Sequence, residues 1–194
     1  SGPIRDNLTA RRTRVDESTK SYGRGVISIR MPIRRASADD VEAIRAVARA
    51  SWTADYPTIL SRETAESGVD EWYEPAQLRA ELDRPATCVF VAEQGGDVVG
   101  FVHALWNREE GVVFRVYVHP DHRGAGFGTD LVEHVRTAME SRGATHLTAM
   151  VLADNEMGQG FYESLGFERV GEGETTIGGE SYGEYSYQLP LDSR

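Results

Sequence analysis

The chain has 194 residues, of which 40% are hydrophobic and 27% charged, with a formal net charge of −10; this composition is typical of one globular domain and excludes a coiled coil, a collagen or a low-complexity polymer. No stretch approaches the roughly 18 apolar residues of a membrane span and no secretory signal is recognisable, so we expect a cytoplasmic protein without membrane contact. An acidic chain lacks the cations that neutralise phosphates, which argues against nucleic-acid binding.

Residues 1–30 have a positive net charge and the rest of the chain has a negative one. Residues 1–30 carry seven Lys and Arg against three Asp and Glu, which leaves 14 against 28 for residues 31–194. We interpret 1–30 as a basic N-terminal arm or extension that packs weakly, with a nucleic-acid-binding arm as the alternative. Residues 31–194 form the domain and contain no lysine. Such a carboxylate-rich surface leads to the hypothesis of a halophilic protein that concentrated salt keeps folded.

The first elements are a strand and a helix. We expect a strand over 32–36, and a helix after Ser37, because an acid three residues later is typical of a helix start. Its apolar residues share one face: Val41, Ile44, Val47 and Ala48. Residues 51–84 contain four aromatic residues and two prolines, so we expect a loop with one or two short helices there.

The remaining elements follow in a regular order. Strands are expected at 88–92, 98–106, 112–118, 146–152, 167–170 and 185–189, and helices at 129–142 and 156–165. Short turns join the first three of these strands, which predicts antiparallel pairing. The order βα(α)βββαβαββ, without internal repeats, predicts one mixed α/β domain. Cys88 lies in an apolar strand and is expected to be a small core residue.

A glycine-rich turn, residues 119–129, joins the strand ending at Val118 to the next helix. Its glycines at 124, 126 and 128 allow backbone N–H groups to point into one concavity, where the helix dipole favours anions. The spacing fits neither a Walker loop nor a dinucleotide fingerprint. The turn therefore predicts a diphosphate site, the alternative being a helix entry without a ligand. We interpret His119 and His122 as surface histidines and expect no metal, because no third ligand lies nearby in the sequence.

Two segments resemble motifs of the GNAT superfamily of acetyl-CoA-dependent N-acetyltransferases. The segment Arg123 to Gly128 matches [QR]-x-x-G-x-[GA]. A second motif, N-x-x-A-x-x-[LF]-Y-x-x-x-G-F, is matched by Asn155, Phe161, Tyr162, Gly166 and Phe167, with Gly158 where the family usually has alanine. The resemblance covers about residues 31–190 and implies the family's fold, a mixed, mostly antiparallel central sheet flanked by helices.

The resemblance also implies where acetyl-CoA binds as co-substrate. The implied contacts are Val116, Tyr117, Val118, Arg123, Gly124, Ala125, Gly126, Phe127, Gly128, Thr129, Asn155 and Phe161. The backbone of 116–118 would pair with the amides of the pantetheine arm, where neighbouring strands splay apart. Asn155 can contact that arm, cap the short helix, or do both.

Acetyl transfer to an amine needs an unprotonated amine and a proton for the departing thiolate. The resemblance places the hydroxyl of Tyr162 beside the coenzyme sulfur, so Tyr162 is the expected acid; packing in the core is the alternative. Glu110, ten residues before Pro120, is the expected base, where the branch of the family that acetylates protein N-termini carries a glutamate. The alternatives are a solvated turn carboxylate at Glu110 and a water chain as the base.

The expected function is direct acetyl transfer from acetyl-CoA to a primary amine: a protein N-terminus, a lysine or a small-molecule amine. The alternative is a coenzyme-A-binding sensor or interaction module without turnover. Carboxylates that would attract a cationic amine occur in two regions: Glu63, Glu66, Asp70, Glu71, Glu74, and Glu172, Glu174, Glu180, Glu184. A homodimer is the commonest assembly of such chains.

Overall fold

The structure is a computed structural model that describes residues 32–60 and 62–192. The basic arm expected at 1–30 lies outside the described residues. The strands are β1 (Ile33–Arg35), β2 (Thr87–Gln94), β3 (Asp97–Asn107), β4 (Glu110–Val118), β5 (His146–Leu152), β6 (Glu168–Ile177) and β7 (Glu180–Pro190). The helices are α1 (Val41–Asp55), α2 (Arg62–Trp72), α3 (Pro75–Leu82), α4 (Phe127–Glu140) and α5 (Glu156–Ser164), with short 3-10 turns at Ala38–Asp40 and Pro120–His122.

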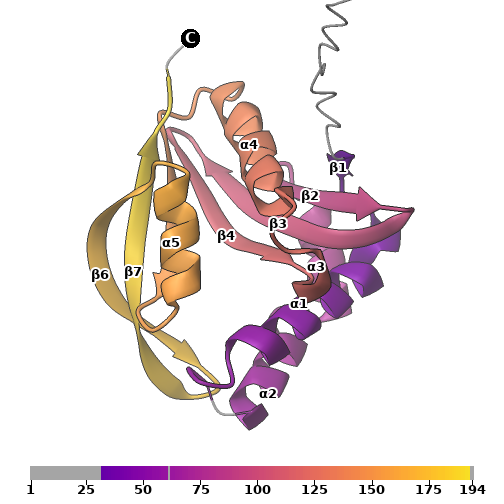
Figure 1. The fold of residues 1–194 in the computed structure, drawn as a ribbon. Coiled ribbons are helices and arrows are strands. Elements are labelled where there is room, and N and C mark those ends of the chain that lie inside the picture. The colour runs from indigo at the N-terminus through magenta and orange to yellow at the C-terminus, as the bar shows by residue number, and fades with distance from the viewer. Residues whose placement is uncertain (1–31, 61, 193–194) are drawn as a thin grey trace, which may run out of the picture.

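The strands form one seven-stranded sheet in the order β1-β2-β3-β4-β5-β7-β6 (Figure 1). Neighbouring strands are antiparallel except β4 and β5, which are parallel. This arrangement confirms the predicted mixed, mostly antiparallel α/β fold flanked by helices.

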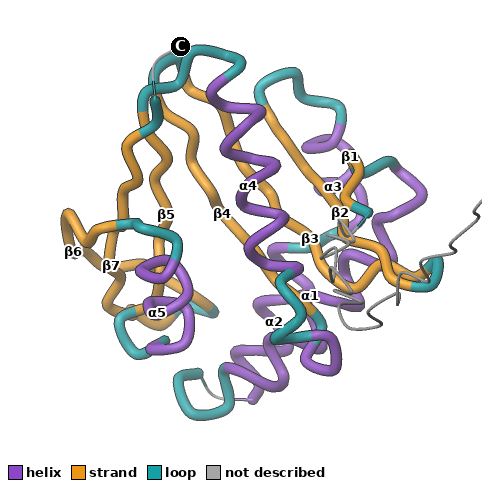
Figure 2. Tube along the Cα trace, turned by 45° about the horizontal axis from the view of Figure 1, so that its top comes forward, coloured by secondary structure: helices purple, strands orange, loops and turns teal. Residues whose placement is uncertain are grey.

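Helices cover both faces of the sheet (Figure 2). One core lies between the sheet and helices α4 and α5, and a second core lies between the sheet and helices α1 to α3. Side chains along β2 point alternately to the two faces of the sheet, and this explains why one strand contributes to both cores. Cys88 and Ala92 belong to the first core, and Val89 and Val91 belong to the second. The buried Cys88 is a core residue, as predicted.

The segment 51–84 is more helical than the sequence suggested. The first helix continues to Asp55, and the two further helices are the short helices predicted there, with less loop between them than expected. Pro75 occupies the first turn of α3, where proline is well tolerated, and Glu74 caps that helix by accepting a hydrogen bond from the Gln77 N–H at 2.8 Å. The aromatic residues that suggested irregular structure form edge-to-face contacts in the second core: Trp52, Tyr56, Trp72 and Tyr73.

The last two strands are also longer than predicted. Instead of two short strands, β6 and β7 form a hairpin around Gly178 and Gly179, which have φ values of 57° and 82°. Two consecutive residues with positive φ produce the tight turn that suits a β-hairpin. The side chains on β6 are mostly exposed, and the weak apolar alternation there gave the sequence prediction little to detect.

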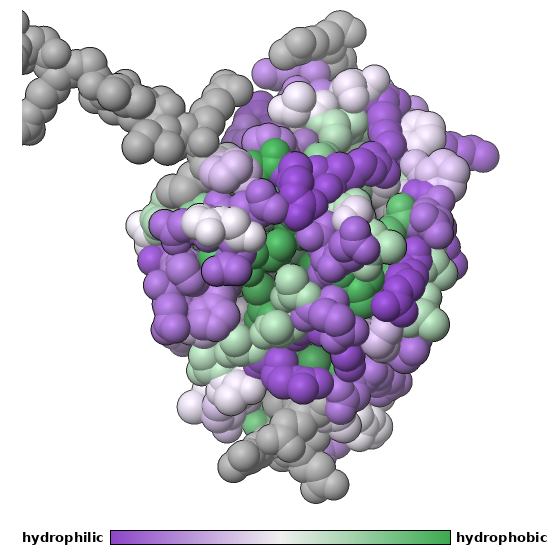
Figure 3. Space-filling view, turned by 90° about the vertical axis from the view of Figure 1, so that its right-hand side faces the viewer, coloured by the Kyte–Doolittle hydropathy of each residue, from purple (hydrophilic) through white to green (hydrophobic). Residues whose placement is uncertain are grey.

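The surface drawn in Figure 3 is mostly hydrophilic, with small hydrophobic patches between the polar side chains. None of the helices within the described ranges is long and apolar enough to cross a membrane.

Candidate active site

The sheet opens between β4 and β5. These strands pair only from Glu110 opposite His146 to Val113 opposite Ala149. The register of β3 against β4 shifts at the next residue, Phe114, and such a bulge bends the strand. Beyond it β4 turns away from β5 (Figure 1), so the β5-facing backbone of the last part of β4 has no sheet partner within residues 32–60 and 62–192.

A cleft of about 900 Å³ fills this opening. Its lining comes from the last part of β4, the glycine turn and α5, and also from α1, α2, α3, β5, β6 and β7. All the predicted cofactor residues line the cleft except Ala125, which lies in the turn between two lining glycines. The structure therefore brings together two motifs that the sequence separates by about 30 residues.

The glycine turn leaves its backbone N–H groups free. Gly124 and Gly126 have φ values of 77° and 93°, a conformation that favours glycine, and α4 begins at Phe127, two residues earlier than predicted. No N–H of residues 124–129 donates to another residue in the described part of the chain. A Cβ atom at Gly124 or Gly126 would meet nothing within 4 Å. The open, donor-rich start of a 14-residue helix fits the diphosphate of coenzyme A.

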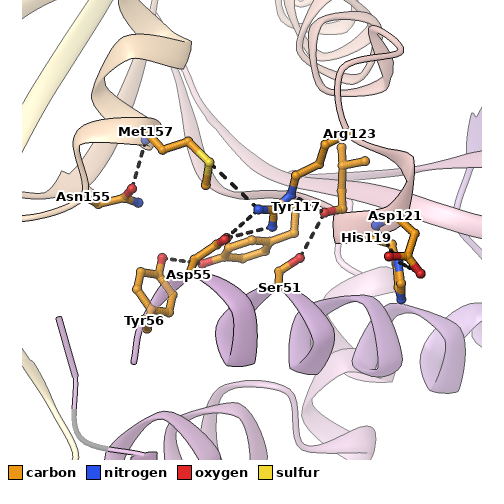
Figure 4. Close-up of polar contacts among 11 residues, drawn as sticks. Ser51, Asp55, Tyr56, Tyr117, His119, Asp121, Arg123, Asn155 and Met157 are labelled. Atoms are coloured by element: carbon orange, nitrogen blue, oxygen red, sulfur yellow. Dashed lines mark hydrogen bonds and ion pairs between the residues drawn. The ribbon is translucent and has the colours of Figure 1, made fainter. Parts of the chain in front are cut away.

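The side chain of Arg123 has a different role from the rest of the turn. Its guanidinium donates two hydrogen bonds to the carboxylate of Asp55, at 2.6 and 2.8 Å, and its Nε donates to the carbonyl oxygen of Val118 at 3.1 Å (Figure 4). Ser51 Oγ donates to the same carbonyl at 3.2 Å. The C-terminal part of α1 is thus tied to the glycine turn, a contact that sequence patterns missed because Asp55 and Arg123 are 68 residues apart.

Tyr162 lies on α5 with its ring buried and its side chain on the wall of the cleft. The ring packs edge-to-face on Phe161 and Phe167 and stacks on Tyr187. Burial, assisted by the neighbouring Tyr117, raises the pKa of the Tyr162 hydroxyl well above its usual value. The hydroxyl hydrogen-bonds to none of the residues that the structure describes. The hydroxyl is therefore protonated at neutral pH, on a residue that lines the cleft.

Asn155 lines the cleft and also caps α5. Its Oδ1 accepts a hydrogen bond from the N–H of Gly158 at 2.9 Å, which confirms the capping role expected of this residue. A Cβ atom at Gly158 would lie 2.7 Å from Asn155 Nδ2. The glycine that stands in place of the family's alanine therefore leaves room for the Asn155 side chain.

Glu110 does not lie with these residues. It is at the start of β4, where β4 and β5 are still paired, and does not line the cleft. Its carboxylate accepts a hydrogen bond from Thr148 Oγ1 at 2.7 Å and lies 3.8 Å from His146 Nε2. The cleft opens four residues further along the strand, at a bulge that the sequence pattern does not reveal.

Three carboxylates line the cleft: that of Asp55, which pairs with Arg123, and those of Glu71 and Glu184. Glu184 is half-buried, and this burial raises the pKa of its carboxyl group. Among the other acidic residues expected near an entrance, several serve structural contacts instead: Asp70 pairs with Arg49, Glu74 caps α3, Glu172 pairs with Arg169, and Glu180 accepts from Tyr182. The side chains of Glu63 and Glu66 lie outside the described part.

Comparisons with known proteins agree with this geometry. Residues 42–167 match the family model of the acetyltransferase (GNAT) family. An acetyltransferase of Yersinia pestis is 33% identical over 98 residues, which are 50% of this chain and 70% of the relative.

Solved structures agree as well. The PaiA N-acetyltransferase of Thermoplasma acidophilum, solved in complex with coenzyme A, superimposes with a TM-score of 0.70 at 26% identity, over 79% of this chain and 97% of that one. The apo form of YjaB from Escherichia coli gives a TM-score of 0.62 at 28% identity, over 81% and 96% of the two chains. The chain belongs to the GNAT family of acetyltransferases.

Proposed function

We propose that the protein transfers the acetyl group of acetyl-CoA directly to a primary amine. The observation that carries this proposal is that the glycine turn, with its free N–H groups, and Tyr162, with its protonated hydroxyl, line one cleft. Acetyl-CoA supplies the activated acetyl thioester. Direct transfer requires that acetyl-CoA and the amine occupy the cleft at the same time.

The glycine turn and β4 hold the coenzyme in this proposal. The N–H groups of residues 124–129 bind its diphosphate, which the dipole of α4 also favours. The unpaired backbone of residues 116–118 offers strand-like hydrogen bonds to the pantetheine amides. Phe161 and Asn155 line the wall that faces this segment.

In this proposal Tyr162 is the general acid and Glu184 is the general base. Because its pKa is raised, the Tyr162 hydroxyl is protonated at neutral pH and gives this proton to the departing thiolate, whose conjugate acid has a pKa of about 8.5 on the cysteine scale. The tyrosinate that remains is a strong base and takes a proton back from solvent. Glu184, whose pKa burial raises, accepts the proton of the amine directly or through water. We therefore propose Glu184 as the base in place of Glu110, because it lines the cleft and Glu110 does not.

A thiol-release assay with acetyl-CoA and a panel of amines tests the function. The panel holds peptides with free N-termini, lysine derivatives, polyamines and amino acids. We expect release that depends on at least one amine. Coenzyme A binding without release for any amine would instead favour the sensor that the sequence left open.

Glu184→Gln tests the base. A glutamine accepts no proton, so we expect kcat/KM to fall about a hundredfold near neutral pH. The deficit is expected to shrink as the pH rises toward the pKa of the amine, because solvent then deprotonates the acceptor. Glu174→Gln, on an exposed residue of β6 outside the cleft, is the matched control. Equal pH profiles for the two variants would contradict the role of Glu184.

A further inference from the structure

Arg115 lines the cleft, and none of the carboxylates that the structure describes forms an ion pair with its guanidinium. Arg115 lies on β4 just beyond the last pair with β5. Its guanidinium carbon lies 4.6 Å from the ring centre of Tyr73 and 5.8 Å from that of Trp72. Aromatic faces attract a cation but leave its planar N–H groups without strong acceptors. The nitrogen Nη1 is buried and has no hydrogen-bond partner among the residues with described side chains.

Neighbouring residues do not neutralise this charge. Arg123, in the same cleft, is bound by the carboxylate of Asp55, whereas no carboxylate in the described ranges pairs with Arg115. His103 lies opposite Arg115 on β3. Burial and the charge of Arg115 lower the pKa of His103 to about 4, so its imidazole is neutral at neutral pH. A buried N–H group without an acceptor is costly, and an anion that reaches Nη1 would remove that cost.

The cleft that Arg115 lines offers groups of both signs. Glu71 and Glu184 also line it, with carboxylates that suit an ammonium group, and Trp72 and Ile177 add apolar surface. The diphosphate of the coenzyme belongs at the glycine turn, so it does not neutralise Arg115 in the proposed function. A ligand with an amine and a separate anionic group would satisfy both kinds of side chain.

We propose that Arg115 binds a carboxylate of the acceptor, so that the acceptor is an amine that also carries a carboxylate: an amino acid or a close analogue. The planar guanidinium can donate two parallel hydrogen bonds to a carboxylate, and the stacked rings of Tyr73 and Trp72 hold it in place. The amine is then directed toward Glu184. This inference rests on the proposed acetyl transfer.

Matched acceptors test the inference. Thiol release is measured with acetyl-CoA and each L-amino acid, the amide of that amino acid, the corresponding decarboxylated amine, and the aminophosphonate analogue. For the preferred amino acid, we expect kcat/KM to exceed that of its amide and its decarboxylated amine by about tenfold to a hundredfold, the range of a charged hydrogen bond. Arg115→Met is expected to abolish this preference, and Arg115→Lys to keep part of it. An aminophosphonate preferred over the amino acid would contradict a carboxylate site.

Arg142→Met is the matched control. The guanidinium of Arg142 lies 5.9 Å from the ring centre of Trp106, and its Nη1 is also buried without a partner, but Arg142 does not line the cleft. We expect this variant to keep the preference for acceptors with a carboxylate, even if its melting temperature is lower than that of wild type. Coenzyme A affinity, measured by titration calorimetry, is expected to be the same for wild type and Arg115→Met, which shows that the variant folds.

Three results would overturn the inference. The first is equal kcat/KM for the amino acids and their amides in the wild-type protein. The second is Arg115→Met with lower stability but an unchanged preference, as expected if a structural water completes the site. The third is a wild-type protein that acetylates none of the carboxylate-bearing amines. Release with other amines would leave the proposed function standing, whereas no release with any amine would remove both.

Discussion

At the scale of single residues, the proposed acid is the hydroxyl of Tyr162. Tyr162→Phe removes that hydroxyl and keeps the ring that packs on Phe161 and Phe167. We expect kcat to fall about a hundredfold or more, because the thiolate then departs without an acid, while coenzyme A affinity is unchanged. Steady-state thiol release and calorimetric titration measure the two quantities.

Tyr187→Phe is the control for that variant. Tyr187 is buried and stacks on Tyr162, but its hydroxyl donates to Glu163 at 3.1 Å and does not line the cleft. Loss of this hydrogen bond is expected to cost about 1 kcal/mol of stability and leave kcat intact. If Tyr187→Phe slowed turnover as much as Tyr162→Phe, ring packing rather than proton donation would explain both.

At the scale of secondary-structure elements, the hydrogen bonds from Arg123 to Asp55 connect the glycine turn to α1. Asp55→Asn leaves the guanidinium of Arg123 without its charged partner, in a partly buried position. We expect the turn to lose its fixed orientation and the Kd for coenzyme A to rise about tenfold, with a smaller change in kcat at saturation.

Asp121→Asn provides the comparison, because Asp121 lies in the same turn but is largely exposed. Its loose pairing with His119 at 3.8 Å is expected to contribute little. Titration calorimetry on both variants is the measurement. An unchanged Kd for Asp55→Asn would show that the glycine turn keeps its shape without α1.

The start of α1 gives a pH-dependent prediction. Asp40 accepts two hydrogen bonds from Arg34 and one from the N–H of Ser37, and the bonds from Arg34 are the main cause that lowers its pKa from 3.8 to about 2. A carboxyl group with a lowered pKa stabilises the fold above its unfolded pKa, and this contribution is lost as the pH falls through its folded value. Asp40→Asn is therefore expected to lower the melting temperature at neutral pH. Between about pH 5 and pH 2, the melting temperature of this variant is expected to fall less than that of wild type. A melting curve against pH that parallels wild type would contradict this.

The same element shows what sequence can predict. The Ser37 and Asp40 signal, the apolar face of α1 and the glycine turn are local patterns, so the sequence placed them correctly. The bulge at Phe114 and the point where β4 and β5 separate depend on register between distant strands. For that reason the sequence did not show that Glu110 lies outside the cleft, and it named Glu184 only as one of several acidic residues. The contacts of Asp55 and Arg115 were not predicted at all.

The whole molecule is acidic and has no lysine beyond Lys20. We propose that its many carboxylates repel one another at low ionic strength and that salt screens this repulsion. The melting temperature is then expected to be much lower in ~0.1 M KCl than in ~2 M KCl, with unfolding on dilution as the extreme result. Equal melting temperatures in both buffers would contradict a halophilic protein without affecting the account of the cleft.

The account as a whole depends on the glycine turn and the opening of the sheet serving one ligand. A crystal structure of the protein with coenzyme A tests this most directly. We expect the diphosphate against the N–H groups of residues 124–129, the pantetheine arm along residues 116–118, and the sulfur beside the hydroxyl of Tyr162. Coenzyme A bound elsewhere, with the glycine turn empty and the cleft filled by side chains, would contradict it.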